Sequence, residues 1–216
     1  MPATPKARRR RAQILAVAID RSSAEGLASL SIGGLASAVG MSKSGLFAHF
    51  GSKEELQLAC VAQAQRHFER GVLQPAADTE LGLPRLRALV SAWFDYVEAL
   101  DYRGGCFFDA ASSEFGSRPG AVRDRLALVC GQWREQLAEQ ARLAIRLGEL
   151  RSDVDPDTLA FQLHAYSGEA NWARELLAEQ GAFERARLAA QATLEAAAAS
   201  PPPALGQAPP RKASAT

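Results

Sequence analysis

Apolar residues recur three and four positions apart along most of this chain, which is the spacing of one face of an α-helix. No convincing stretch alternates apolar and polar positions as a half-buried β-strand does. The periodic runs end where glycine occurs, as helices commonly do. These ends lie at Gly26, Gly40, Gly51, Gly71, residues 101–105, residues 117–120, Gly148 and Gly181. The pattern predicts an all-α protein of about nine helices.

The segment from Ser31 to Phe50 has the pattern of two short helices joined by a tight turn. Ser31 is placed to cap the first helix, whose apolar positions form one inward stripe that ends at Gly40. Ser42 is placed to cap the second helix, over about residues 43–50, in which Leu46 and Phe50 share the inward face. Two helices joined in this way form a helix-turn-helix.

The outward face of the second helix is made of small residues with longer side chains on either side. Small side chains let a helix backbone approach base edges in the major groove, and the longer ones reach its walls. Glycine inside a helix costs about 1 kcal/mol relative to alanine, so Gly45 favours a role other than helix stability. The small residues are Ser44, Gly45 and Ala48, and the flanking ones are Lys43, Phe47 and His49. The alternative is a linker between two glycine turns with ordinary solvated polar groups.

Positive charge is concentrated in the amino-terminal part of the chain. Residues 1–56 hold eight lysines and arginines against four acidic residues, although the formal net charge of all 216 residues is only +1. The run Arg8 to Arg11 is expected to form a basic arm before an amphipathic first helix and to follow DNA phosphates. Ser52 and Glu55 form a capping box, and Lys53 between them can share a phosphate with the free N–H groups of that helix.

The run from Arg11 to Leu56 resembles the amino-terminal DNA-binding domain of TetR-type transcriptional regulators. The matching residues are Ile14, Ala18, Gly26, Ser31, Leu35, Ala36, Gly40, Met41, Ser42, Leu46, Phe47, His49, Phe50 and residues 52–56. The resemblance implies a three-helix DNA-binding domain over residues 1–56, in which residues 42–48 meet the major groove. It also implies that Ser31, Phe47, His49 and Lys53 touch the DNA backbone.

Two departures from the family bear on DNA affinity. Phe47 stands where family members commonly carry tyrosine, so a hydroxyl directed at phosphate is replaced by a ring that can only stack or pack. Gly33 and Gly34 replace the polar or acidic residues usual early in the second helix of the domain, which lowers the intrinsic stability of that helix.

Residues 57–199 are expected to form a larger helical domain, and residues 200–216 a disordered tail rich in proline and small residues. Asp155 is placed to cap a long helix that begins at Pro156 and carries apolar residues on two faces. One face can close the core. In line with the resemblance, the other face and the last helix are interpreted as a homodimer surface, against the alternative of a monomeric core helix. The dimer candidates are Phe161, Ala165, Gly168, Trp172 and Leu176.

The resemblance also implies a cavity for a small-molecule effector in this second domain. Its candidate residues are His67, Trp93, Tyr96, Tyr102, Cys106, Phe107, Phe108, Trp133 and His164. Aromatic residues at helical spacing are also what an ordinary core contains, and a lone histidine is commonly structural. Cys106 follows two glycines, which raises the hypothesis of a thiol that senses oxidants or electrophiles, against that of an inert buried thiol.

The helix-turn-helix pattern and its positive charge predict a protein that binds double-stranded DNA. The resemblance implies a sequence-specific transcriptional regulator, a repressor that binds its operator as a homodimer and responds to an unknown small-molecule effector. The alternatives are a dimeric helical adaptor or sensor without sequence-specific DNA binding, a Cys106-based redox-responsive regulator, and an activator of the same DNA-binding design. No nucleophile elbow, phosphate-binding glycine loop or helical His/Glu pair occurs, so no enzyme, cofactor or metal is expected. Three widely spaced cysteines argue against a disulfide framework or a zinc ribbon. No signal peptide or membrane span is found, so the expected location is the cytoplasm.

Overall fold

The computed structural model describes residues 5–100 and 102–199, so the predicted tail of residues 200–216 lies outside it. The helices are α1 (Pro5–Glu25), α2 (Ile32–Ala38), α3 (Lys43–Phe50), α4 (Lys53–Phe68), α5 (Gln74–Ala76), α6 (Leu83–Glu98), α7 (Phe107–Phe115), α8 (Ala121–Arg146), α9 (Pro156–Leu177) and α10 (Ala182–Ala197). A 3-10 turn, η1 (Leu27–Ser29), follows α1, and a π turn, η2 (Glu69–Leu73), joins α4 to α5. Because α4, η2 and α5 are continuous, the described residues form nine helices, which confirms the all-α prediction.

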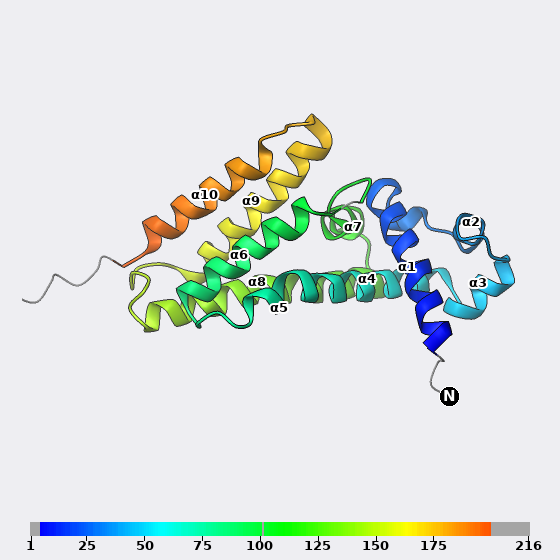
Figure 1. The fold of residues 1–216 in the computed structure, drawn as a ribbon, viewed down its shortest axis with the longest axis horizontal. Helices are drawn as coiled ribbons and strands as arrows, with labels where there is room; N and C mark the ends of the chain where they lie inside the picture. Colours follow the sequence, from blue (N-terminus) through cyan, green and yellow to red (C-terminus); the bar gives the residue numbers. More distant parts are fainter. Residues whose placement is uncertain (1–4, 101, 200–216) are drawn as a thin grey trace, which may run out of the picture.

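Helices α1, α2 and α3 form a small unit at one end of the molecule (Figure 1). Fully buried aliphatic side chains hold it together, because each removes apolar surface from water. They are Ile14, Ile19, Leu27, Leu35, Leu46 and Leu56. The same apolar cluster continues into α7 and the start of α8 through Phe107, Ala111, Val122, Leu126 and Val129. The small unit therefore shares its core with helices from the other part of the chain.

The fourth helix runs from the small unit into the larger part of the molecule and does not stop at Gly71. The predicted helix end at Gly71 is wrong, because α4 passes through η2 into α5. A Cβ at this position would lie 2.5 Å from Cδ2 of Tyr96 on α6. Gly71 is therefore required by the close approach of two helices rather than by a helix end.

Helices α6, α8, α9 and α10 surround a second core in the larger part. Helices α9 and α10 pack side by side along one side of the molecule, as Figure 1 shows. The α9 helix begins as predicted, since Asp155 Oδ1 accepts a hydrogen bond from Thr158 N at 2.6 Å and Pro156 occupies the first turn. No helix in the described ranges is both long and apolar enough to cross a membrane.

Helix α7 and the loop before it tie the two parts together. The Arg103 guanidinium donates to the Asp20 carboxylate on α1, with Nε and Oδ2 2.9 Å apart. The Glu114 carboxylate near the end of α7 accepts a hydrogen bond from Ala28 N in η1 at 3.0 Å. Gly104 packs directly on α1, and its own N–H donates to Ser23 Oγ at 3.1 Å.

Replacing Gly104 with alanine should destabilise the protein by about 1–3 kcal/mol, the usual cost of an atom inserted into a packed site. The added Cβ would lie 2.1 Å from the backbone oxygen of Ser23, and backbone cannot rotate out of the way. Urea unfolding monitored by circular dichroism would measure the change. Gly131→Ala is the control, because nothing lies within 4 Å of a Cβ there. Since alanine favours a helix over glycine, this variant should be more stable than the wild type by about 0.5–1 kcal/mol. Equal stability of the Gly104 variant and the wild type would contradict the packing argument.

Candidate DNA-binding surface and ligand cavity

Helix α3 lies at the outer edge of the small unit (Figure 1), and its residues are buried on one side and exposed on the other. Leu46 and Phe50 are buried beneath it, as the periodicity predicts. The outward side chains are Lys43, Ser44, Phe47 and Ala48, and Phe47 is 54% exposed. His49 is half-buried at the end of the helix. The structure thus presents a helix whose outer face is free of bulky groups apart from the Phe47 ring and the Lys43 chain.

Both short helices begin with a serine cap. Ser31 Oγ accepts from Gly34 N at 3.1 Å, and Ser42 Oγ accepts from Gly45 N at 3.1 Å. Both serines are exposed, so each hydroxyl can still donate to a phosphate oxygen. A Cβ at Gly45 would lie 3.1 Å from Ser42 Oγ, tighter than ordinary packing. The tight space beside the Ser42 cap therefore favours glycine at position 45, in addition to the close approach to DNA expected of the outer face.

The basic run does not form an arm before the first helix, because α1 begins at Pro5 and includes it. Two of its arginines turn inward instead. Arg10 donates to Val39 O at the end of α2 at 2.9 Å. Arg11 donates to His49 O at the end of α3, and its guanidinium lies 4.3 Å from the centroid of the Phe50 ring. Arg8 and Arg9 remain exposed. Arg10 and Arg11 thus hold the helix-turn-helix on α1.

Lys53 is also engaged within the protein. Its ammonium donates to Ala28 O in η1, while the buried amide of Gln57 donates to Leu27 O at 2.9 Å. An ammonium has three N–H donors, so Lys53 retains donors for a phosphate. The structure shows that η1 is held by α4 on one side and by Glu114 of α7 on the other.

The larger part of the molecule contains a cavity of about 610 Å³, within the usual range for small-molecule sites. Six of the nine predicted residues line it, namely Trp93, Tyr96, Cys106, Phe108, Trp133 and His164. Lining residues not predicted from the sequence include Phe68, Glu69, Asp109, Ser112, Cys130 and Arg134. Phe68 contacts Tyr96, Phe108 and Trp133 edge to face, with ring centroids 5.0 to 6.4 Å apart. The cavity wall is therefore largely aromatic.

Three predicted pocket residues do not line the cavity. Phe107 is buried in the core shared with the small unit and does not line the cavity. His67 Nδ1 lies 3.2 Å from the Tyr102 hydroxyl, and these two groups satisfy each other outside the cavity. Burial lowers the pKa of His67. Helical spacing predicts which side chains face inward, but it does not distinguish a side chain that lines the cavity from one that packs elsewhere in the molecule.

The titratable groups on the α7 side of the cavity are shifted by burial. Burial raises the pKa of the Asp109 carboxyl to about 6, and no arginine or lysine of the described residues pairs with it. Burial also raises the pKa of the Cys106 thiol far above its ordinary value, and Asp109 acts in the same direction. A protonated, buried thiol is a poor nucleophile, which disfavours the hypothesis of a Cys106-based sensor. No group of three metal-ligating side chains occurs among the described residues.

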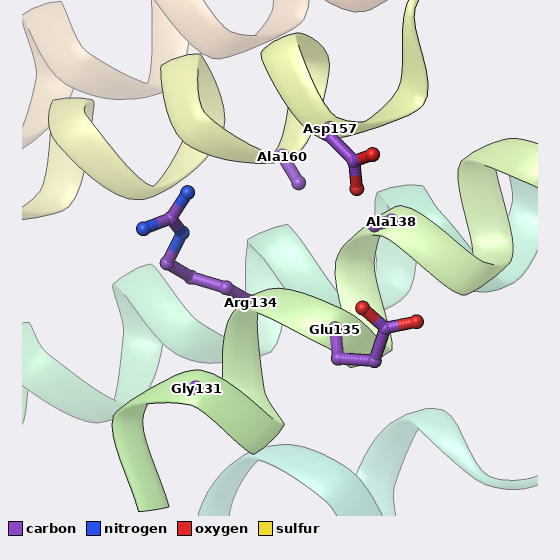
Figure 2. Close-up of a pocket in the computed structure, with 6 residues that line it drawn as sticks. All are labelled: Gly131, Arg134, Glu135, Ala138, Asp157 and Ala160. Carbon is purple, nitrogen blue, oxygen red and sulfur yellow. The ribbon is translucent and has the colours of Figure 1, made fainter. Parts of the chain in front are cut away.

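A smaller pocket of about 190 Å³ lies between α8 and α9 (Figure 2). Arg134 extends from α8 toward α9 in this view, and its guanidinium lies on the other side of the picture from the carboxylates of Glu135 and Asp157. Arg142 bridges the two acids, 2.7 Å from Glu135 and 2.9 Å from Asp157. The pair with Asp157 links α8 to α9, whereas the pair with Glu135 lies within α8, so both acids at the rim already have a structural partner.

The outward face of α9 carries large apolar side chains in contact with solvent. Phe161 is 57% exposed, Trp172 49% and Leu176 65%, and Ala165 is also exposed. Nothing lies within 4 Å of a Cβ placed at Gly168, so the surface is open at this position. Large exposed apolar patches are common at protein–protein contact surfaces.

Two family models match this chain. Residues 14–60 match the model for bacterial regulatory proteins of the tetR family, and residues 82–190 match the model for the tetracyclin repressor-like, C-terminal domain. The first match contains α2 and α3, and the second contains helices α6 to α9.

Individual proteins are also similar to this chain. The transcriptional regulator AcuR of Cereibacter sphaeroides is 28% identical over 165 residues, which span 76% of this chain and 70% of AcuR. The HTH-type transcriptional activator FasR of Mycolicibacterium smegmatis is 36% identical over 89 residues, 41% of each protein. The crystal structure of a TetR transcriptional regulator from Chloroflexus aurantiacus superposes with a TM-score of 0.81 at 25% identity, over 90% of this chain and 98% of that one.

Proposed function

Since this chain belongs to the TetR family of bacterial transcriptional regulators, we propose that it is a homodimeric repressor that leaves its operator when a small molecule occupies its cavity. One observation carries the proposal. Helix α3 presents an open, solvent-facing side at one end of the molecule, and the helix that follows it continues as α4 and η2 into the cavity wall at Phe68 and Glu69.

The proposed DNA contacts divide into groove and backbone contacts. In the groove, the small side chains of α3 let its backbone approach the base edges while Lys43 reaches beyond them. Serine hydroxyls at the two caps, His49 and Lys53 contact phosphates, and exposed Arg8 and Arg9 add charge on α1. The full set is Ser31, Ser42, Lys43, Ser44, Gly45, Phe47, Ala48, His49 and Lys53. A dimer then places two α3 helices in successive major grooves, about 34 Å apart.

Release from DNA requires that the ligand bind one conformation more tightly than the other. Helix α7 is suited to couple the sites, because Phe108 and Asp109 line the cavity while Glu114 holds η1 of the DNA-binding unit. A ligand that shifts α7 therefore changes how α1 and α3 are held. The outward face of α9 with α10 forms the proposed dimer surface through Phe161, Ala165, Gly168, Trp172 and Leu176.

Fluorescence anisotropy of the protein with its own upstream intergenic DNA tests the proposed regulator, at several salt concentrations and with unrelated duplex as competitor. Binding that survives the competitor is expected of a sequence-specific regulator. If the competitor removes all binding, an adaptor without sequence-specific DNA binding is favoured, unless a selection from random duplexes recovers a defined operator.

Lys43→Ala should weaken operator binding by about tenfold or more and lower the salt dependence, because each half-site loses a cation that reaches the DNA. Lys43→Arg is the control, since it keeps the charge. Size-exclusion chromatography should show an unchanged dimer for both variants. An operator affinity for Lys43→Ala equal to that of the wild type would exclude the proposed groove contact.

A second candidate, an activator, is favoured by the match to FasR, which is described as an activator. A reporter gene behind the bound promoter separates the two candidates. Deleting the regulator raises expression if the protein represses and lowers expression if it activates.

A further inference from the structure

One end of the large cavity carries nitrogen groups that no described residue satisfies. Trp133 Nε1 and His164 Nδ1 are buried and have no hydrogen-bond partner within the described part of the chain. Arg134 lines the same cavity, and its guanidinium lies 5.7 Å from the Phe161 ring but pairs with no described acid. An indole N–H can only donate, and burying it unpaired costs about 1–3 kcal/mol. A ligand acceptor at this end would recover that cost.

The three groups belong to one neighbourhood formed by α6, α8 and α9. The Trp93 ring on α6 contacts both aromatic partners, with centroids 5.2 Å from Trp133 and 5.3 Å from His164. The Trp93 and His164 rings are nearly parallel, at 8°. Burial lowers the pKa of His164, and the positive charge of Arg134 lowers it further. An imidazole Nδ1 that carries a proton can donate a hydrogen bond, so His164 can act as a donor beside Trp133.

The acidic groups that line the cavity stand on other elements than these donors, Asp109 on α7 and Glu69 on η2. Asp109 acts on the thiols of Cys106 and Cys130, whereas the charge that acts on His164 is Arg134. Glu69 accepts a hydrogen bond from Gln65 at 3.0 Å. Apolar and aromatic lining residues include Phe68, Leu73, Tyr96 and Phe108. The cavity thus combines a group of N–H donors with a largely apolar, aromatic wall.

We infer that the cavity binds an organic acid with an apolar, ring-containing body, whose carboxylate accepts hydrogen bonds from Trp133 Nε1 and His164 and pairs with Arg134. A carboxylate only accepts hydrogen bonds, so its two oxygens suit three N–H-bearing groups. A ligand ammonium group or hydrocarbon would leave the indole N–H unpaired. The aromatic wall of the cavity takes the body of the ligand. The named class depends on the proposed function, because it describes the effector of the same site.

Isothermal titration calorimetry with 2-naphthoate and 2-naphthamide tests the class near neutral pH. The two probes have the same ring and nearly the same shape, but only the first is charged. We expect 2-naphthoate to bind about tenfold more tightly, the effect of a charge-assisted hydrogen bond. Arg134→Gln should reduce the affinity for 2-naphthoate to that for the amide and leave the amide unchanged. Trp133→Phe should weaken both probes by about fivefold, because both offer an acceptor to the indole N–H.

Arg123→Gln controls for the substitution itself, because it makes the same change at an exposed position on α8 that does not line the cavity. This variant should not alter binding of either probe. Equal or tighter binding of the amide, an Arg134→Gln protein that still prefers 2-naphthoate, or no binding of either probe would overturn the inference. Because this titration contains no DNA, those results are distinct from a failure of operator binding, which would overturn the proposed regulator instead.

Discussion

Trp172→Arg should convert the dimer into monomers and weaken operator binding by a hundredfold or more. That factor is about the gain in affinity that results from linking two DNA-binding domains in one molecule. Trp172 lies in the middle of the exposed apolar stripe of α9, between Phe161 and Leu176. A guanidinium at the centre of an apolar interface loses its water without finding a partner, which opposes association. Light scattering after size exclusion measures the oligomeric state, and anisotropy measures affinity.

Leu128→Arg is the matched control for this change. Leu128 is 50% exposed, against 49% for Trp172, but it lies on α8 rather than on α9. The control variant should remain dimeric and bind the operator with wild-type affinity. A Trp172→Arg protein that stays dimeric at low concentration would show that the dimer forms through another surface.

Arg11→Ala should weaken operator binding by about tenfold or more while leaving the dimer and the affinity of the cavity for its ligands unchanged. The Arg11 guanidinium caps the last turn of α3 through His49 O and stacks on Phe50. Its removal leaves an unsatisfied carbonyl at a half-buried site and costs about 1–3 kcal/mol of local stability. The recognition helix then reaches the DNA with a less defined orientation.

The salt dependence of binding separates this role from a phosphate contact. Arg9 is exposed on the same helix, so Arg9→Ala should lower the slope of affinity against salt concentration. Arg11→Ala should leave the slope unchanged although it weakens binding. A reduced slope for Arg11→Ala would show that Arg11 meets phosphate directly. Arg11→Lys should recover only part of the affinity, because lysine lacks the planar group that stacks on the ring.

Local chemistry explains which features of the fold could be predicted from the sequence. The caps at Ser31, Ser42 and Asp155 act within three residues of themselves, so their partners are readable from spacing. The inward faces of the short helices follow from the 3.6-residue period for the same reason. Gly71 was misread because the Tyr96 ring that requires the glycine is on another helix.

Long-range contacts explain what could not be predicted. Arg11 and His49 are 38 positions apart, and nothing in either neighbourhood of the sequence indicates that they meet. Periodicity placed Phe107 and Phe108 inside the molecule, but adjacent helical residues point in different directions. Both rings contact the core shared with the small unit, and only Phe108 also lines the cavity. The sequence likewise does not indicate that Trp133 Nε1 and His164 Nδ1 lack hydrogen-bond partners, because this depends on residues from other helices that surround them.

The shared core has a consequence for building chimeric regulators. Phe107 and Ala111 of α7, with Val122 and Leu126 of α8, complete the interior beneath α1 and α3. A DNA-binding domain cut from this protein after α4 would expose to solvent the apolar surface that α7 and α8 now cover. A DNA-binding domain from another protein would not fit the faces of α7 and α8 that pack against this one. Exchange of operator specificity should therefore succeed with outward residues of α3 alone, or with the head and its matching faces of α7 and α8 moved together.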